Sequence, residues 1–124
     1  MQHSADSQLF TTRIVVVESD PSTAEMLHTF FRLMEFEITL ADPDSAVVDT
    51  IRRVAPPVVL LDLDLPDLRA LELALEINEK CEGVEVIFTT ARHAPAPAGA
   101  LVVPKPTGRF EELLSLLEVV LERC

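Results

Sequence analysis

Short apolar runs alternate with stretches of helical periodicity along the whole chain. The short runs are rich in β-branched or large apolar residues and predict five strands, at about 13–17, 37–41, 58–61, 84–89 and 101–103. The longer stretches repeat apolar residues on one helical face and predict helices at about 21–35, 43–54, 68–81 and 108–122. This alternation predicts an α/β protein: a doubly wound five-stranded parallel sheet with helices on both faces and right-handed crossovers.

The third apolar run is unbroken from Val58 to Leu61 and leads directly into Asp62. Such a run suits a strand buried on both faces of a parallel sheet. Open α/β sheets carry their ligands and chemistry at the C-terminal ends of the strands, so Asp62 is a candidate functional carboxylate. The alternative is that Asp62 is only the first polar residue of a turn, a position that aspartate often takes.

Two predicted helices begin with the same dipeptide. Asp20-Pro21 and Asp42-Pro43 each place a capping carboxylate before a proline at the first helical position. In the first helix, helical spacing assigns a set of large apolar side chains to the core: Met26, Phe30, Phe31 and Met34.

The segment between the fourth and fifth predicted strands departs from the alternation. Residues 91–100 contain Pro95 and Pro97, and two prolines at alternate positions forbid a regular helix. We therefore expect an Ala/Pro loop here in place of a fourth crossover helix.

Composition limits the kind of protein. A chain of 124 residues, 48% hydrophobic and 25% charged, is typical of one soluble globular domain. We expect a flexible N-terminal tail at 1–12 and a domain at 13–124. Cys81 and Cys124 lack metal-binding spacing and indicate reduced thiols, and no apolar run is long enough to span a bilayer, so a cytoplasmic location without membrane contact is expected.

The formal net charge of −11 argues against direct nucleic-acid binding, because a phosphate backbone would be repelled. The same acidity is compatible with a carboxylate cluster that binds a divalent cation.

The predicted sheet brings polar residues from four strand ends to one edge. They are Glu18, Ser19, Asp20, Asp62, Thr90 and Lys105. Carboxylates hold a hard divalent cation through oxygen. The cation and Lys105 would neutralise charge on a phosphoryl group in transfer to Asp62, and Thr90 could donate a hydrogen bond to it.

Five motifs follow one another in a characteristic order. They are Val-Val-Glu-Ser-Asp at 16–20, Leu-Leu-Asp at 60–62 with Pro66 four residues later, Ile-Phe-Thr-Thr-Ala at 87–91, Gly-Ala at 99–100 and Lys-Pro at 105–106. Together they resemble the receiver domain of two-component response regulators, from Arg13 to about Arg123. The resemblance implies the flavodoxin-like strand order 2-1-3-4-5.

The resemblance also implies roles for single residues. Asp62 is expected to be the phosphoacceptor, Glu18 an acidic-pocket residue and Asp64 the donor of a backbone carbonyl to the metal. Thr90 is expected to be the switch hydroxyl and Lys105 the phosphate-binding lysine. The implied cofactor is Mg²⁺, the implied partner is a sensor histidine kinase or a phosphotransfer protein, and the domain is a phosphoacceptor rather than an enzyme. The family also has a cis peptide bond before the proline that matches Pro106.

Several positions depart from the family pattern. Ser19 stands where the family has its main aspartate ligand, so Mg²⁺ binding should be weak unless Asp20 turns in; Asp20 is alternatively only a helix cap. Arg69-Ala70 replaces the usual Asp-Gly, and Val102 replaces the switch aromatic residue. These departures weaken the expected coupling between phosphorylation and the switch.

Three functional hypotheses follow. The first is a phosphorylatable receiver, and the second is a pseudo-receiver that binds proteins without phosphate. The third is a small hydrolase of the haloacid-dehalogenase type, suggested by the Asp-x-Asp at Asp62 and Asp64 but disfavoured by its place on the third strand. Leu116 and Val119, with the segment 92–103, indicate a surface for a downstream protein partner or a homodimer. The sequence leaves open whether the domain works alone or within a longer chain.

Overall fold

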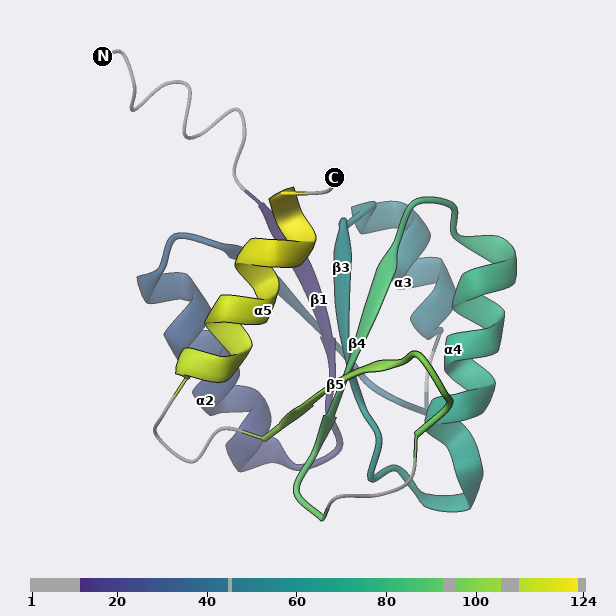
Figure 1. Ribbon diagram of the computed structural model, residues 1–124. Helices are drawn as coiled ribbons and strands as arrows, with labels where there is room; N and C mark the ends of the chain where they lie inside the picture. Colours follow the sequence, from purple (N-terminus) through teal and green to yellow (C-terminus); the bar gives the residue numbers. More distant parts are fainter. Residues whose placement is uncertain (1–11, 45, 93–95, 106–109, 123–124) are drawn as a thin grey trace.

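A parallel sheet of five strands crosses the centre of the molecule (Figure 1). The computed structural model describes residues 12–44, 46–92, 96–105 and 110–122. In it the strands are β1 (Arg13–Val17), β2 (Glu37–Ala41), β3 (Val58–Asp62), β4 (Glu85–Thr90) and β5 (Leu101–Pro104). Their order is β2-β1-β3-β4-β5, which confirms the α/β class and the strand order that the resemblance implied.

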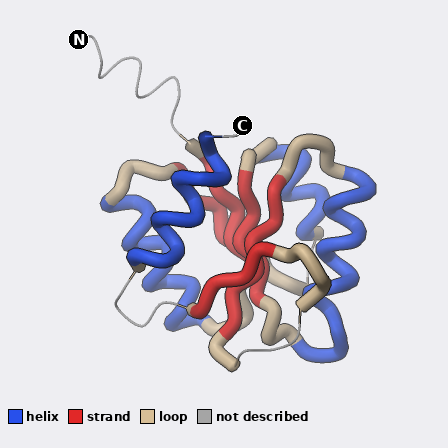
Figure 2. Tube along the Cα trace, viewed as in Figure 1, coloured by secondary structure: helices blue, strands red, loops and turns tan. Residues whose placement is uncertain are grey.

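Helices cover both faces of the sheet (Figure 2). They are α2 (Pro21–Leu33), α3 (Val47–Val54), α4 (Arg69–Lys80) and α5 (Glu111–Glu122), with the short 3₁₀ helix η1 (Pro66–Leu68) before α4. One apolar core joins the sheet to α2 and α5, and the other joins it to α3 and α4. Across the first core, the ring of Phe30 stacks on that of Phe110 with centroids 3.8 Å apart.

Strand β3 is central and contributes to both cores. Val58 and Leu60 pack with the α2–α5 core, while Val59 and Leu61 pack with the α3–α4 core. All five β3 residues are buried, including Asp62 at the strand's end. The unbroken apolar run thus forms a strand buried on both faces, as its sequence predicted.

The cap predicted at the start of the first helix is confirmed. The Asp20 carboxylate accepts hydrogen bonds from the Thr23 backbone N–H at 2.9 Å and from the Thr23 hydroxyl at 2.7 Å. Helix α2 ends at Leu33, earlier than expected, and Glu35 then adopts a left-handed φ of 68°. Met34 is therefore 45% exposed, and its assignment to the core was wrong.

The second predicted cap was wrong. Helix α3 begins at Val47, and its N-cap is Ala46, whose side chain makes no capping bond. The Asp42 side chain instead accepts a hydrogen bond from the Asp44 backbone N–H at 2.9 Å. Aspartate can close such a local turn as readily as it caps a helix, and here the turn delays the helix.

The connection between β4 and β5 contains no helix in its described parts, residues 91–92 and 96–100. Ala100 donates its backbone N–H to the Pro97 carbonyl at 3.1 Å, and Gly99 takes a φ of 81° in this turn. The expected Ala/Pro loop is therefore confirmed over these residues. Residues 1–11 of the tail predicted at 1–12, the peptide bond before Pro106 and Cys124 lie outside the described residues.

No helix in the described part of the chain is long and apolar enough to cross a membrane.

Removal of a buried side chain from β3 should lower the stability of the protein. We expect Leu60→Ala to lower the free energy of unfolding by about 2–5 kcal/mol, because Leu60 is 1% exposed and its loss leaves a cavity between the sheet and the helices. The same substitution at Leu75, which is 67% exposed on α4, should change it by less than about 0.5 kcal/mol. Urea denaturation of both variants measures this, and equal losses would contradict a core centred on β3.

Candidate functional site

The C-terminal ends of β1, β3 and β5 meet at one charged cluster. The Lys105 ammonium lies 2.9 Å from Oε2 of Glu18, 3.0 Å from Oδ1 of Asp62 and 3.6 Å from Oδ2 of Asp64. The Lys105 side chain is only 12% exposed, and the Glu18 and Asp62 side chains are almost fully buried. The structure thus brings together Glu18, Asp62 and Lys105, which follow three different strands and which the sequence predicted to meet at one edge of the sheet.

Local backbone geometry fixes Asp62 in this cluster. Its Oδ1 accepts a hydrogen bond from the Asp64 backbone N–H at 2.9 Å. Its Oδ2 accepts one from the Ser19 hydroxyl at 2.9 Å and a longer one from the Ser19 backbone N–H at 3.3 Å. Both carboxylate oxygens are therefore oriented by groups from the loops that follow β1 and β3.

Lys105 is placed by the end of the sheet. Its backbone N–H donates to the Thr90 carbonyl at 2.8 Å, which extends the pairing of β5 with β4 by one residue. Burial alone would lower the pKa of the Lys105 ammonium, but hydrogen bonds to Glu18 and Asp62 outweigh burial and raise it. Lys105 is therefore a cation under all physiological conditions.

The two buried carboxyls differ in pKa. Burial raises the pKa of Glu18 above its usual value, and the charge of Asp62 adds to this effect against the hydrogen bond from Lys105. Burial also acts to raise the pKa of Asp62, but hydrogen bonds from Lys105, the Asp64 backbone and Ser19 outweigh it and lower the pKa. The hydrogen bonds thus keep Asp62 ionised, as a nucleophile must be. Of the two neighbouring carboxyls, Glu18 is the one whose pKa rises.

The cluster holds more negative than positive charge. Three carboxylates surround one ammonium group, and like charges about 4 Å apart repel by roughly 4 kcal/mol at an effective dielectric constant near 20. A second cation between Glu18 and Asp62 would relieve this repulsion.

One oxygen of Glu18 fits such a cation. Its Oε1 is buried and finds no hydrogen-bond donor among the described residues, while Oε2 accepts from Lys105 and from the Asp20 backbone N–H. Yet within the described ranges no three His, Cys, Asp or Glu side chains are arranged to hold a metal ion. Oε1 of Glu18 thus fits a divalent cation. The site has one carboxylate fewer than the family pattern, because Ser19 stands at that position.

The carboxylate of Asp20 is engaged at the start of α2. It is exposed, and hydrogen bonds from the Thr23 side chain and backbone lower its pKa. Of the two roles that the sequence left open, the structure has Asp20 as the cap of α2.

Asp64 makes contacts that sequence reasoning missed. Its Oδ1 accepts a hydrogen bond from the Thr90 hydroxyl at 2.8 Å, and its Oδ2 accepts one from the Ala91 backbone N–H at 2.7 Å. The resemblance had implied a role only for the backbone carbonyl of Asp64, and its carboxylate entered only the hydrolase hypothesis. The available signal was the Asp-x-Asp spacing, which places a second carboxylate two residues beyond a strand end.

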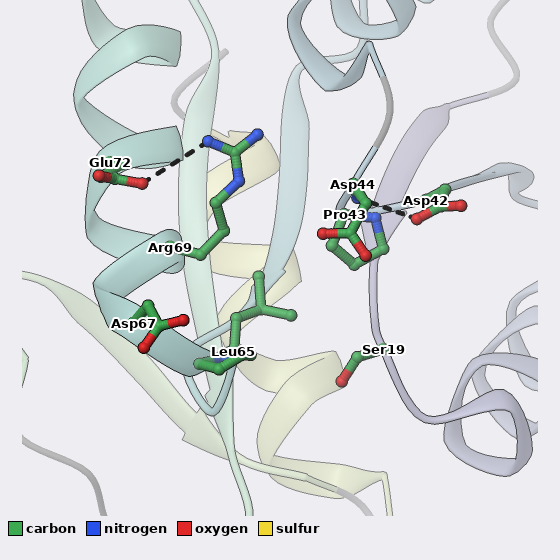
Figure 3. A pocket seen from close by; sticks show the side chains of 9 residues that line it. Ser19, Asp42, Pro43, Asp44, Leu65, Asp67, Arg69 and Glu72 are labelled. Carbon is green, nitrogen blue, oxygen red and sulfur yellow. Dashed lines mark hydrogen bonds and ion pairs between the residues drawn. The ribbon is translucent and has the colours of Figure 1, made fainter.

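A pocket of about 360 Å³ opens beside the cluster (Figure 3). Its wall is formed by the loops after β1, β2 and β3 and by the start of α4, and Ser19 lies at its edge. Arg69 pairs with Glu72 at 3.7 Å on this wall. Four of the nine lining residues are acidic, and the lining is Ser19, Asp42, Pro43, Asp44, Leu65, Pro66, Asp67, Arg69 and Glu72.

Two apolar side chains of the surface expected to bind a downstream partner or a second copy of the chain are exposed. Val102 on β5 is 37% exposed and Val119 on α5 is 56% exposed. Leu116 instead packs partly against the α2–α5 core.

The chain matches a family model. The model is described as the response regulator receiver domain, and it covers residues 14–104. This range includes β1 to β5 and all the side chains of the charged cluster except Lys105, which follows it directly.

Curated relatives are transcriptional regulators of greater length. The chain is 32% identical, over 96% of its residues, to the probable transcriptional regulatory protein TcrX of Mycobacterium tuberculosis. It is 34% identical, over 64% of its residues, to the DNA-binding response regulator MtrA of Mycolicibacterium smegmatis. The chain spans 53% of TcrX and 35% of MtrA.

Solved structures share the fold. The response regulator TrrA of Thermotoga maritima, in complex with Mg²⁺ and BeF, superposes with a TM-score of 0.75 at 24% identity, covering 89% of this chain and 99% of TrrA. TrrA in complex with the histidine kinase ThkA gives a TM-score of 0.71, with 90% and 99% coverage. These matches leave the haloacid-dehalogenase hypothesis without support.

Loss of the buried ammonium should destabilise the protein. We expect Lys105→Met to lower the free energy of unfolding by about 3 kcal/mol at pH 7, because it leaves buried carboxylates uncompensated. As a control, Lys80→Met removes an exposed helical pair with Glu76 and should cost at most about 0.5 kcal/mol.

The pH dependence of this difference follows from the pKa shifts. The contribution of Lys105, whose pKa is raised, is complete below the pKa of an unfolded lysine and is lost as pH rises through the folded pKa. The contribution of Asp62, whose pKa is lowered, is present above the unfolded pKa and is lost as pH falls through the folded pKa. Denaturation across pH should therefore show the largest difference near neutrality, and a constant difference would contradict the pairing.

Proposed function

The chain belongs to the response regulator receiver domain family, and we propose that it accepts a phosphoryl group on Asp62 from a sensor histidine kinase or a phosphotransfer protein. The observation that carries this proposal is the state of Asp62. It is fully buried at the C-terminal edge of the sheet, yet hydrogen bonds from Lys105, Ser19 and the Asp64 backbone favour its ionised form.

The transfer needs only an ionised oxygen and an accessible phosphorus. A carboxylate oxygen of Asp62 attacks the phosphorus of a phosphohistidine, an O–P bond forms and the P–N bond breaks. The imidazole leaves with the electron pair and takes a proton from solvent. Lys105, already 3.0 Å from Asp62, would neutralise the charge that the phosphoryl oxygens bring.

We infer that Mg²⁺ assists this transfer and binds weakly. Glu18 Oε1, an oxygen of Asp62 and the Asp64 backbone carbonyl are the groups that would hold it. When bound, the ion supplies positive charge next to the phosphoryl oxygens. Because Ser19 gives a neutral oxygen in place of a carboxylate, the affinity should be lower than with a third carboxylate.

A protein of the same fold supports a histidine kinase as the phosphodonor partner. TrrA, a protein of the same fold, forms a complex with a histidine kinase. We propose that a cytoplasmic kinase or phosphotransfer protein reaches Asp62 here too. The exposed Val102 and Val119, with the segment 92–103, are the proposed contact for a downstream protein partner or a second copy of the chain. Because the chain has a formal net charge of −11, it is not expected to bind nucleic acid itself, nor a membrane.

A pseudo-receiver is the second candidate function. It is favoured by Ser19 at the metal position, by Val102 at the switch position and by the absence of a helix in the described parts of the β4–β5 connection. In that case the domain binds its partner constitutively and Asp62 takes up no phosphate.

Direct phosphorylation separates these two candidates. Incubation of the chain with acetyl phosphate and Mg²⁺, followed by intact-mass analysis, should show one phosphoryl adduct. Asp62→Asn should show none, and Lys105→Ala should form the adduct about 10²-fold more slowly, because a preorganised charge at the phosphoryl group is lost. An adduct that persists in Asp62→Asn would contradict the assignment of the acceptor. No adduct on the wild-type chain with either acetyl phosphate or a phosphorylated kinase would favour the pseudo-receiver.

The role of Asp20 can be tested through metal binding. Asp20→Asn keeps a good capping group, and Asp20→Ala does not. We expect both variants to bind Mg²⁺ within about threefold of the wild-type affinity, because an exposed charge outside the ligand set is largely screened. Only Asp20→Ala should lower the midpoint of thermal unfolding. A loss of about tenfold or more in Mg²⁺ affinity in both variants, measured by calorimetry, would make Asp20 a ligand.

A further inference from the structure

The Asp64 carboxylate occupies a set of hydrogen-bond donors that face the acceptor. Two hydrogen bonds reach it, from the Thr90 hydroxyl at 2.8 Å and the Ala91 backbone N–H at 2.7 Å, and the Lys105 ammonium forms an ion pair with it at 3.6 Å. Thr90 and Ala91 follow β4, which lies on the other side of β3 from β1, while Lys105 also contacts Glu18. A hydroxyl, an amide N–H and an ammonium group together form a site for an anion with several oxygens.

Lys105 and the Asp64 backbone connect this set of donors to Asp62. Lys105 bridges Oδ1 of Asp62 at 3.0 Å and Oδ2 of Asp64 at 3.6 Å. The Asp64 backbone N–H donates to the same Oδ1 of Asp62 at 2.9 Å. A phosphoryl group on the Lys105 side of Asp62 would therefore bring its oxygens to the donors that Asp64 already holds.

We propose that Asp64 is an internal occupant of the phosphoryl-binding donors. Its carboxylate competes with a phosphoryl group on Asp62, and in the unphosphorylated chain it holds Thr90 and Ala91 in the arrangement of a bound anion. This inference rests on the proposed function, since it takes Asp62 as the acceptor. It adds a residue that sets how readily Asp62 is phosphorylated. The same residue sets how far the contacts of Thr90 and Ala91 change when Asp62 is phosphorylated.

Competition has a quantitative consequence. A site whose donors are free in only a fraction of the molecules binds its anion more weakly by that fraction. The negative charge of Asp64 also opposes a dianionic group a few ångströms away. A purely structural role, in which Asp64 only closes the turn at Thr90 and Ala91, would give no competition for the donors.

Beryllofluoride with Mg²⁺ is a suitable probe, because it adds to a carboxylate as a phosphoryl analogue. We expect Asp64→Ala to bind it about tenfold more tightly than the wild-type chain, and the nearly isosteric Asp64→Asn, which guards against a folding defect, to change in the same direction. Asp49→Asn, which removes one exposed charge on α3, should bind it as the wild type does.

The Ala91 amide gives a readout that does not depend on phosphorylation. In ¹H–¹⁵N spectra of the free proteins, we expect its resonance to move in Asp64→Ala, because the amide loses its carboxylate. Beryllofluoride should return it toward the wild-type position, since the analogue takes over the same donor.

The possible failures are distinguishable. Equal affinities in the wild type and Asp64→Ala, or an Ala91 resonance that beryllofluoride does not return, would overturn the inference and leave Asp62 as the acceptor. No binding to any variant would overturn both the acceptor assignment and the competition.

Discussion

The site depends on one ammonium group buried among carboxylates. Lys105 touches Glu18 from the end of β1 and Asp62 from the end of β3, and it is itself attached to β4 through its backbone. Charge therefore joins the ends of β1, β3 and β5, and a backbone hydrogen bond adds the end of β4. Such a cluster contributes little net stability, but it is costly to leave unpaired, so the position of Lys105 is tightly constrained. The same charges that constrain the fold also prepare an ionised Asp62.

The surplus of negative charge gives the cluster its chemical properties. Two buried carboxylates, Glu18 and Asp62, have pKa values shifted in opposite directions, and one oxygen of Glu18 is left without a donor in the described part of the chain. A cation is favoured on the Ser19 side, and an anion on the side of Thr90 and Lys105. Ser19 weakens the first site, and Asp64 occupies the second. Under the proposed function, Ser19 and Asp64 together would make Asp62 difficult to phosphorylate.

The sequence was sufficient for the fold and for bringing Glu18, Asp62 and Lys105 to one edge, but it also put Asp20 among the site candidates and missed the side chain of Asp64. A strand buried on both faces leaves a plain apolar signature, as at Val58–Leu61, and parallel strands bring their ends to one edge by topology alone. It was not sufficient for local competition among hydrogen bonds. Asp20 and Asp42 precede proline in the same way, yet only Asp20 caps a helix, because the side chain of Asp42 closes a turn with Asp44 instead. The contacts of Asp64 depend on where β4 ends in space, which no periodicity encodes.

The most direct measurement is a crystal structure of the chain with Mg²⁺ and beryllofluoride. We expect beryllium bonded to Asp62, the ion held by Glu18 and Asp62, and the Asp64 side chain displaced from Thr90 and Ala91 by fluorine atoms. A structure in which Asp62 carries no adduct, while the Lys105 and Asp64 contacts are unchanged at saturating probe, would contradict a phosphoryl-accepting site.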